Sequence, residues 1–206
     1  MYHESKHPLV KHKLTVLRSN ITQHKQFREL VGEITMLLGY DAMTNLEIEP
    51  IKVETPLTGT MGARLKNEIV IVPILRAGVG MLEGMLSLVP NARVGFVGIY
   101  RDPETKMPVS YYEKFPSDLH SPHFFIVDPM LATGGSIVAT IDMLKEKGFK
   151  TVTVISIIAS PEGMKLVEES HPDVDIFVGS IDEYLDENKY IVPGLGDAGD
   201  RLFGTK

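Results

Sequence analysis

Short, nearly continuous runs of apolar residues recur through the middle of this chain, separated by stretches that have one polar face. Apolar runs of about four to eight residues are typical of strands that are buried on both faces of a parallel sheet. We therefore predict strands at Ile69–Leu75, Val94–Tyr100, Phe124–Val127 and Val152–Ala159, with a weaker one at Val174–Val178.

Between several of these runs the periodicity changes to that of helices. Apolar residues recur about every 3.6 positions along Ile21–Gly39, where Thr22 is the predicted N-cap and Gly39 the predicted C-terminal stop. Three more helices are predicted, at Gly80–Val89, Ser136–Lys147 and Pro161–Ser170. Strands that alternate with helices predict an α/β fold with an open, mostly parallel, doubly wound sheet.

Three segments depart from this alternation. Leu46–Thr55 alternates weakly and is followed by a turn at Pro56–Gly59, which indicates two short strands around a turn. Arg101–Phe115 predicts a β-hairpin arm that protrudes from the sheet, whereas the tail Tyr190–Lys206 is rich in glycine. No linker divides the sequence, so residues 1–206 are expected to form a single domain.

Composition and charge narrow the class of protein. Hydrophobic residues make up 43% of the chain and charged residues 23%, as in ordinary soluble domains. The lack of cysteine excludes disulfides, thiolate catalysis and cysteine-ligated zinc. No apolar stretch approaches the roughly 20 residues of a membrane span, and no secretory signal is visible, so a cytoplasmic protein is expected. The formal net charge of −6 disfavours a nucleic-acid partner, but it leaves small anionic ligands open.

The strongest chemical signal is Phe124–Ser136, in which a buried strand leads to an acid, a short loop and Thr-Gly-Gly-Ser. Ligands of open α/β sheets bind at the carboxyl ends of strands, where Asp128 is expected to lie. The two glycines let backbone N–H groups point at one anion, to which Thr133 and Ser136 can also donate. The loop is therefore predicted to bind a terminal phosphate, with sugar hydroxyls on Asp128. A glycine-rich turn without a ligand is the alternative, and it is less typical of this combination.

This motif resembles the signature of the phosphoribosyltransferase family, and its form Val127–Ser136 is similar to that of the uracil-specific branch. Most relatives carry two adjacent acids, whereas here Pro129 takes the second place and leaves one carboxylate for the ribose. The resemblance implies that the loop binds phosphoribosyl pyrophosphate (PRPP), which carries Mg²⁺ with it, so no separate metal site is predicted. The implied PRPP contacts are Asp128, Pro129, Met130, Leu131, Ala132, Thr133, Gly134, Gly135 and Ser136.

Two arginines are expected at the same edge of the sheet, each at the end of a predicted strand. Arg76 lies in Pro73–Gly78 and Arg101 in Gly98–Thr105. A guanidinium binds phosphate oxygens bidentately and stays charged, which suits a pyrophosphate. The resemblance implies that the two arginines clamp this group. From the residues alone, a surface arginine that caps a loop is an equally good interpretation of Arg76. For Arg101 the alternative is a salt bridge to Asp102 or Glu104.

The tail segment Tyr190–Arg201 resembles the uracil-binding hood of the same branch. Uracil presents two carbonyl acceptors around one N–H donor, and a glycine-rich backbone can match this pattern, whereas cytosine would leave buried groups unpaired. The resemblance implies uracil contacts through the backbones of Ile191, Gly196 and Ala198. Asp197 is implied to contact uracil and PRPP, and it is the candidate acceptor for the proton of uracil N1.

The same tail contains a misleading match, because Gly194–Gly199 fits the dinucleotide-binding pattern G-x-G-x-x-G. That pattern needs a helix, a strand and an acid about 20 residues farther on, but only seven residues follow Gly199. An NAD site is therefore rejected. A Walker A loop is rejected as well, since the chain has no Gly-Lys-Ser/Thr.

The residues and the resemblance together predict a pentosyltransferase of pyrimidine salvage that converts uracil and PRPP into UMP and pyrophosphate. The predicted catalytic residues are Asp128, Arg76, Arg101 and Asp197. The resemblance also implies a homodimer or higher homo-oligomer and, as in some members, activation by GTP. One alternative is a pyrimidine-responsive RNA-binding regulator on the same fold, which the net charge disfavours. Another is a hypoxanthine or guanine phosphoribosyltransferase, whose members usually carry an acid pair where Asp128-Pro129 stands.

Overall fold

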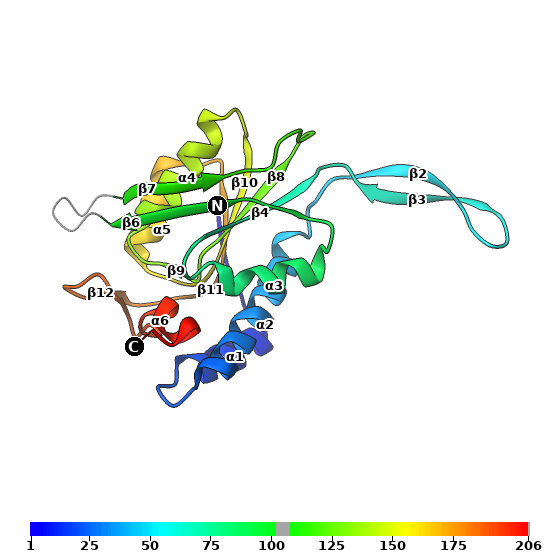
Figure 1. Cartoon of the computed structure of the whole chain (residues 1–206). Helices are drawn as coiled ribbons and strands as arrows, with labels where there is room; N and C mark the ends of the chain where they lie inside the picture. The colour runs from blue at the N-terminus through cyan, green and yellow to red at the C-terminus, as the bar shows by residue number, and fades with distance from the viewer. Residues whose placement is uncertain (102–107, 206) are drawn as a thin grey trace.

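The computed structural model describes residues 1–101 and 108–205, and a central sheet with helices on both sides dominates it (Figure 1). The strands of this sheet are β1 Tyr2–Glu4, β4 Ile69–Leu75, β5 Arg93–Val94, β6 Phe96–Arg101, β7 Pro108–Lys114, β8 His123–Val127, β9 Met130–Leu131, β10 Thr151–Ala159 and β11 Asp175–Ile181. Their order is β1-β11-β10-β8-β4-β6-β7, with β5 beside β4 and β9 beside β10. All neighbours are parallel except β7, which is antiparallel to β6.

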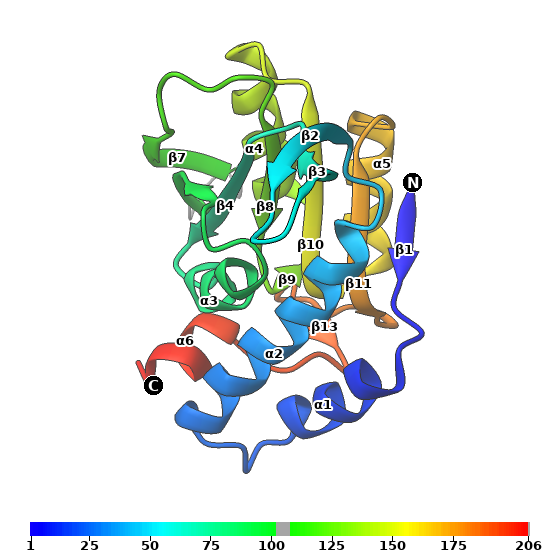
Figure 2. The ribbon, with the colours of Figure 1, turned by 90° about the vertical axis from the view of Figure 1, so that its right-hand side faces the viewer.

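Helices cover both faces of the sheet (Figure 2). On one face lie α1, α2, α3 and the short α6, and on the other lie α4 and α5. Their bounds are α1 Pro8–Arg18, α2 His24–Ala42, α3 Val79–Leu88, α4 Gly135–Glu146, α5 Pro161–Ser170 and α6 Ala198–Phe203. No helix in the described ranges is long and apolar enough to cross a membrane.

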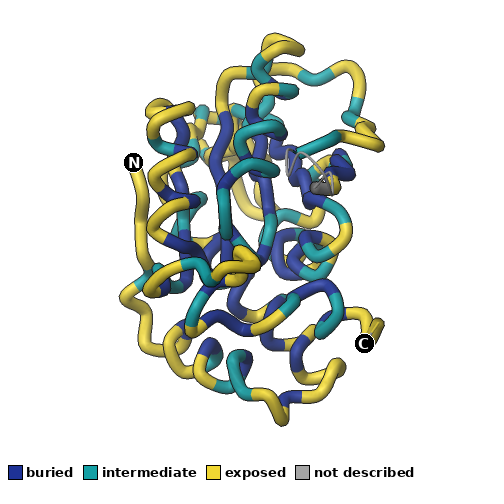
Figure 3. The backbone as a smooth tube through the Cα atoms, turned by 90° about the vertical axis from the view of Figure 1, so that its left-hand side faces the viewer, coloured by how far each residue is buried: buried dark blue, intermediate teal, exposed yellow. Residues whose placement is uncertain are grey.

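Alternate residues of the central strands belong to two hydrophobic clusters, one on each face of the sheet. On β8, Phe125 and Val127 pack with α1, α2 and α3, whereas Phe124 and Ile126 pack with α4 and α5. A strand covered on both sides needs apolar residues at every position, which explains the continuous runs in the sequence. Figure 3 shows these strands as the buried centre of the molecule. The predicted α/β class with a mostly parallel sheet is thereby confirmed.

The helix expected over Ile21–Gly39 runs instead over His24–Ala42, so both of its expected ends are wrong. Thr22 does not cap the helix, because its hydroxyl donates back to a carbonyl of α1 at 2.6 Å. Gly39 does not end the helix either. A Cβ on Gly39 would lie 2.8 Å from Met85 Sδ, so this glycine serves the close approach of α2 to α3.

The strand expected at Val94–Tyr100 is divided into β5 and β6 at Gly95. A Cβ on Gly95 would lie 2.9 Å from the ring of Phe115, which packs closely there. The described part of the expected arm Arg101–Phe115 is β7, which pairs with β6 as the last strand of the sheet and does not leave it. The predicted turn, Asp102–Thr105, lies outside the described residues.

A different hairpin extends from the body of the molecule (Figure 1). Its strands β2 Ile48–Glu54 and β3 Gly59–Leu65 form a two-stranded antiparallel sheet of their own. The turn between them is closed by Thr55, whose hydroxyl oxygen accepts from the Thr58 N–H at 3.0 Å. This confirms the two short strands that the sequence indicates around Pro56–Gly59.

The glycine-rich tail contains short elements that its composition conceals. Its strand β13 Ile191–Val192, which precedes α6, pairs in antiparallel fashion with β12 Tyr184–Leu185, just before the tail. The N-terminal α1 is also absent from the sequence prediction, although its signals are present. Pro8 occupies its first turn, and His7 Nδ1 caps it by accepting from the Leu9 N–H at 3.1 Å.

Candidate active site

The carboxyl ends of β4, β6 and β8 meet at one edge of the sheet, because these strands are parallel neighbours. Arg76 follows β4, Arg101 ends β6 and Asp128 follows β8, so the three residues lie at this edge as predicted. The loop after β4 also touches the end of β8 directly. A Cβ on Gly78 would lie 2.5 Å from the carbonyl oxygen of Val127. The loop that follows β4 and the end of β8 are therefore in direct contact.

Asp128 has an unusual proton affinity for an aspartate. Burial raises the pKa of its carboxyl from 3.8 to about 7, and the hydrogen bond from the Met130 N–H to Oδ1, at 3.3 Å, opposes this rise without cancelling it. The residue is nevertheless half-buried and not fully enclosed, and it lines a cavity at the strand end. A carboxyl of this kind changes its charge near neutral pH, and hydroxyl donors or a cation placed beside it would favour the charged form.

The raised pKa of Asp128 predicts how Asp128→Asn changes stability. Because the folded pKa of about 7 exceeds the ordinary 3.8, the native state holds the proton more tightly than the unfolded chain. This contribution to stability is complete below the unfolded pKa, declines with rising pH and is lost once the pH passes the folded pKa. Asparagine shows no such decline. We therefore expect the Tm of Asp128→Asn, relative to wild type, to rise by several degrees between about pH 5 and about pH 8. Thermal unfolding tests this, and an unchanged Tm difference would contradict the raised pKa.

The loop that follows Asp128 is fixed to β10. The Pro129 carbonyl accepts from the N–H groups of Ile157, at 3.1 Å, and Ile158, at 3.0 Å, and β9 pairs with the end of β10. Gly134 has a φ of 83°, a left-handed conformation that favours glycine, and it is the N-cap of α4. The loop therefore presents the first N–H groups of α4, with the positive end of the helix dipole, in front of Asp128.

A cavity of about 80 Å³ lies in front of this loop. It brings together most of the PRPP contacts implied by the sequence, whereas Pro129 and Gly135 belong to the loop but do not line the cavity. The lining residues are Asp128, Met130, Leu131, Ala132, Thr133, Gly134, Ser136 and Ile137.

Two residues that support the loop from behind were not predicted from the sequence. Ser160, which is fully buried, donates its hydroxyl to the Ala132 carbonyl at 2.6 Å and accepts from the Gly163 N–H at 2.9 Å. A Cβ on Gly163 would lie 2.3 Å from the Ala132 carbonyl oxygen. Ser160 and Gly163 thus hold the loop from the start of α5. The available signal is the pattern Ser-Pro at the start of a helix, which predicts an N-cap but not its second partner.

Arg76 connects this edge to α6. Its Nη2 lies 3.5 Å from Asp200 Oδ1, and a Cβ on Gly199 would lie 3.5 Å from the same Nη2 and 3.3 Å from Asp197 Oδ1. The Arg76 side chain is 59% exposed and can bind an anion from solvent. Asp200 is a further residue that the sequence reasoning misses. Its signal is the spacing Asp-x-x-Asp at a helix start, where Asp197 Oδ1 caps α6 by accepting from the Asp200 N–H at 2.8 Å.

Arg101 is placed by its backbone alone. Its strand partner is Pro108, and a Cβ on Gly135 would lie 3.7 Å from Pro108 Cγ. The end of β6 is therefore next to the first turn of α4. This position agrees with a role near the anion loop, and the clamp formed by two arginines stays a prediction.

The tail segment (Tyr190–Arg201) is anchored in the core by its side chains. Ile191 and Ala198 are 3% and 2% exposed and belong to the cluster under α1, α2 and α3. Gly196 has a φ of 78°, and a Cβ there would find only Arg201 Cδ, at 3.7 Å. Because the side chains of Ile191 and Ala198 point into the core, these residues can bind a flat polar ligand only through their backbone N–H and C=O groups. A hollow of about 440 Å³ next to it is lined in part by Gly196, Asp197 and Asp200.

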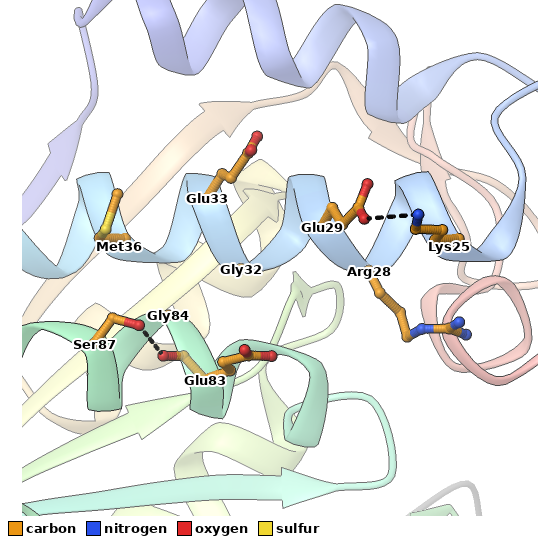
Figure 4. Close-up of a pocket in the computed structure, with 9 residues that line it drawn as sticks. All are labelled: Lys25, Arg28, Glu29, Gly32, Glu33, Met36, Glu83, Gly84 and Ser87. Atoms are coloured by element: carbon orange, nitrogen blue, oxygen red, sulfur yellow. Dashed lines mark hydrogen bonds and ion pairs between the residues drawn. The ribbon is translucent and has the colours of Figure 1, made fainter. Parts of the chain in front are cut away.

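A second hollow, of about 490 Å³, lies between α2 and α3 (Figure 4). Its wall includes Lys25, Arg28, Glu83 and Ser87, but none of the site residues predicted from the sequence. Figure 4 shows the ion pair of Lys25 with Glu29, at 3.7 Å, along α2. This hollow is set apart from the strand ends and is not part of the candidate active site.

The site contains few metal-binding side chains. Within residues 1–101 and 108–205, no group of three or more histidine, aspartate or glutamate side chains is arranged to hold a metal ion. Asp128 and Asp197 are nevertheless oxygen donors of the kind that Mg²⁺ accepts, and Mg²⁺ is often held by one or two carboxylates together with substrate phosphates.

Comparison with known proteins agrees with this geometry. The uracil phosphoribosyltransferase family model matches residues 4–205. The chain is 53% identical over 201 residues to the uracil phosphoribosyltransferase of Streptococcus suis, covering 97% of this chain and 96% of the relative. It is 54% identical, with the same coverage, to that of Agathobacter rectalis. Among solved structures, the AQ2163 protein of Aquifex aeolicus superimposes with a TM-score of 0.93 at 44% identity, covering 100% of this chain and 99% of that one.

Proposed function

The chain belongs to the uracil phosphoribosyltransferase family and makes UMP and pyrophosphate from uracil and PRPP, and we propose that the edge formed by β4, β6 and β8 is where it does so. The observation that carries this assignment is the contact of Arg76 with α6. It joins the loop that follows β4 to the tail segment, so an anion site and a base site adjoin each other at one place.

The 5′-phosphate of PRPP belongs in the loop at the start of α4. The first N–H groups of a helix have no partner within the helix, and they lie at the positive end of its dipole. Both features favour a phosphate at the glycine-capped start of α4. The hydroxyls of Thr133 and Ser136 lie in the wall of the same cavity. Asp128, which lines the same cavity, then accepts hydrogen bonds from the ribose hydroxyls.

The pyrophosphate belongs near Arg76 and Arg101. Arg76 is exposed, permanently charged and held 3.5 Å from Asp200, so an incoming phosphate competes for a loosely paired guanidinium. Mg²⁺ bound to the pyrophosphate would neutralise the charge that develops as this group departs. The residues that can hold the ion, directly or through water, are Asp128 and Asp197, whose carboxylates suit it.

Uracil belongs on the backbone of the tail segment at Ile191, Gly196 and Ala198. Uracil N1 forms its bond to C1 of the ribose as the bond from C1 to the pyrophosphate oxygen breaks, and the N1 proton leaves to a base. Asp197 is the candidate acceptor, since it belongs to the tail segment and its Oδ1 lies, like Arg76 Nη2, next to Gly199. The protein otherwise contributes positioning and stabilisation of charge.

Replacing Gly196 by valine tests the placement of uracil. The side chain would occupy a left-handed position on the ligand side, so we expect the KM for uracil to rise about tenfold or more, with a smaller change for PRPP. The matched control is Gly148→Val, because Gly148 has a similar φ of 88° and open space around it, far from the site. An unchanged KM for uracil in Gly196→Val would remove the tail segment from the base site.

Three further properties come from family membership alone. We propose that the chain assembles as a homodimer or higher homo-oligomer, that it acts in the cytoplasm and that GTP is its effector. The alternative of an RNA-binding regulator gains no support, because the relatives carry the enzyme's name and the net charge is −6.

A further inference from the structure

We propose that Arg18 and Asp182 act as a positioning pair that sets where the tail segment presents its backbone to uracil. The inference rests on the proposed assignment of uracil to Ile191, Gly196 and Ala198. Neither residue belongs to the loops that follow β4, β6 and β8, since Arg18 ends α1 and Asp182 follows β11.

Asp182 follows β11 and is a buried carboxylate with every partner a donor. Its side chain is only 2% exposed. Oδ2 accepts from Arg18 Nη1 at 2.6 Å and from the Gly194 N–H at 2.9 Å. Oδ1 accepts from Arg18 Nη2 at 2.5 Å and from the Ser180 hydroxyl at 3.2 Å. The carboxylate is therefore fully occupied and held in one orientation.

Arg18 completes the hold on Gly194. Its Nη1 also donates to the Gly194 carbonyl at 2.7 Å, so the pair engages both polar backbone groups of this one residue. Gly194 has a φ of 62°, and a Cβ there would lie 2.0 Å from the carbonyl oxygen of Ile191. The pair thus fixes a tight turn that lies between Ile191 and Gly196, two of the proposed uracil contacts.

Two more arginines donate to backbone carbonyls within the tail segment and just after it. Arg201 donates to the carbonyls of Leu195, at 2.8 Å, and Ser19, at 2.6 Å. Arg28 donates to the Leu202 carbonyl at 2.8 Å, and Figure 4 shows its side chain extending from α2 toward α6. Arg18 is the last residue of α1, and Arg201 donates to Ser19, the residue that follows it, so both contacts tie the tail segment to the end of α1. Movement of α1 would therefore move the backbone that faces uracil.

Apolar burial alone would leave this backbone poorly placed. The side chains of Ile191 and Leu195 give the segment its hold on the core, but such contacts are not directional. Hydrogen bonds from charged groups are short and directional, and they are strong when buried. The pair therefore determines the register of the turn, which a base with a fixed pattern of donors and acceptors must match.

The test separates positioning from stability by measuring KM for both substrates. Asp182→Asn places an amide among groups that all donate, so the turn loses its anchor. We expect the KM for uracil to rise about 10-fold to 100-fold, while the KM for PRPP stays within about twofold. Arg18→Lys keeps the charge but cannot reach both carboxylate oxygens and the Gly194 carbonyl, so it should give a smaller rise in the same direction.

A matched control lies on α1, the helix that carries Arg18. Lys13 of α1 pairs with Glu33 of α2 at 2.6 Å on the surface, so Lys13→Ala removes an exposed ion pair of α1 without touching Gly194. It should leave both KM values unchanged. If Asp182→Asn does not fold, Arg18→Lys carries the test. A folded Arg18→Lys with an unchanged KM for uracil, or with equal losses for uracil and PRPP, would overturn the inference. If Gly196→Val raises the KM for uracil in that case, the base site stands and only the pair fails.

Discussion

Gly78→Ala is expected to lower kcat/KM for PRPP by about 100-fold or more, because a misplacement of about 1 Å in a site can cost that much. A Cβ on Gly78 would lie 2.5 Å from the Val127 carbonyl oxygen and 2.6 Å from the Ile74 N, and both are backbone atoms in the central sheet. The strands cannot yield, so the loop that carries Arg76 must move away from Asp128. Steady-state kinetics with varied PRPP measures the loss.

The control for this substitution is Gly32→Ala. A Cβ on Gly32, within α2, would have nothing within 4 Å, and alanine favours a helix over glycine by about 1 kcal/mol. Gly32→Ala should therefore keep wild-type kinetics and an equal or higher Tm. Circular dichroism shows whether Gly78→Ala is folded. A folded Gly78→Ala enzyme with wild-type kcat/KM would mean that the two loops need not touch.

Arg76→Ala is expected to lower kcat/KM for PRPP by about 100-fold to 1,000-fold, the usual effect of removing one preorganised donor from developing charge. The effect on uracil should be much smaller, since Arg76 contacts the tail segment at Asp200 and lies next to Gly199. Arg76→Lys should recover part of the activity, because it restores the charge but not the bidentate fork.

A second arginine gives a matched control for charge and ion pairing. Arg93 forms an ion pair with Glu68 at 3.5 Å, the same separation as Arg76 and Asp200, but at the amino ends of β4 and β5. Arg93→Ala should leave the kinetics unchanged. Equal losses for uracil and PRPP in Arg76→Ala would indicate general disruption of the site and argue against a specific pyrophosphate contact.

Much of the fold could be predicted from the sequence because the central strands are buried on both faces. The bounds of β4 match the predicted run, since every residue from Ile69 to Ile74 must be apolar there. Glycine was harder to interpret. Gly39 has the sequence signature of a helix end, but its function is to let Met85 approach, and that contact lies 46 positions along the chain. Local pattern cannot distinguish these two uses.

The candidate site, like the fold, could be predicted from the sequence only in part. Arg76, Asp128 and the loop up to Ser136 were predictable, because each follows a strand and parallel strands end at one edge. Asp200 and the pair of Arg18 with Asp182 were not, because their partners lie far away in the sequence. The spacing of Asp197 and Asp200 indicates a helix cap, but no local pattern identifies the distant partner of a side chain that positions a site through tertiary contacts.

The central claim is that this chain joins uracil to PRPP at the edge where β4, β6 and β8 end. The most direct measurement is the production of UMP from labelled uracil and PRPP with Mg²⁺, beside parallel reactions with cytosine, hypoxanthine and orotate. Turnover of uracil alone, lost in Arg76→Ala, is the predicted result. Comparable turnover of another base, or no product from uracil by a folded enzyme, would contradict it.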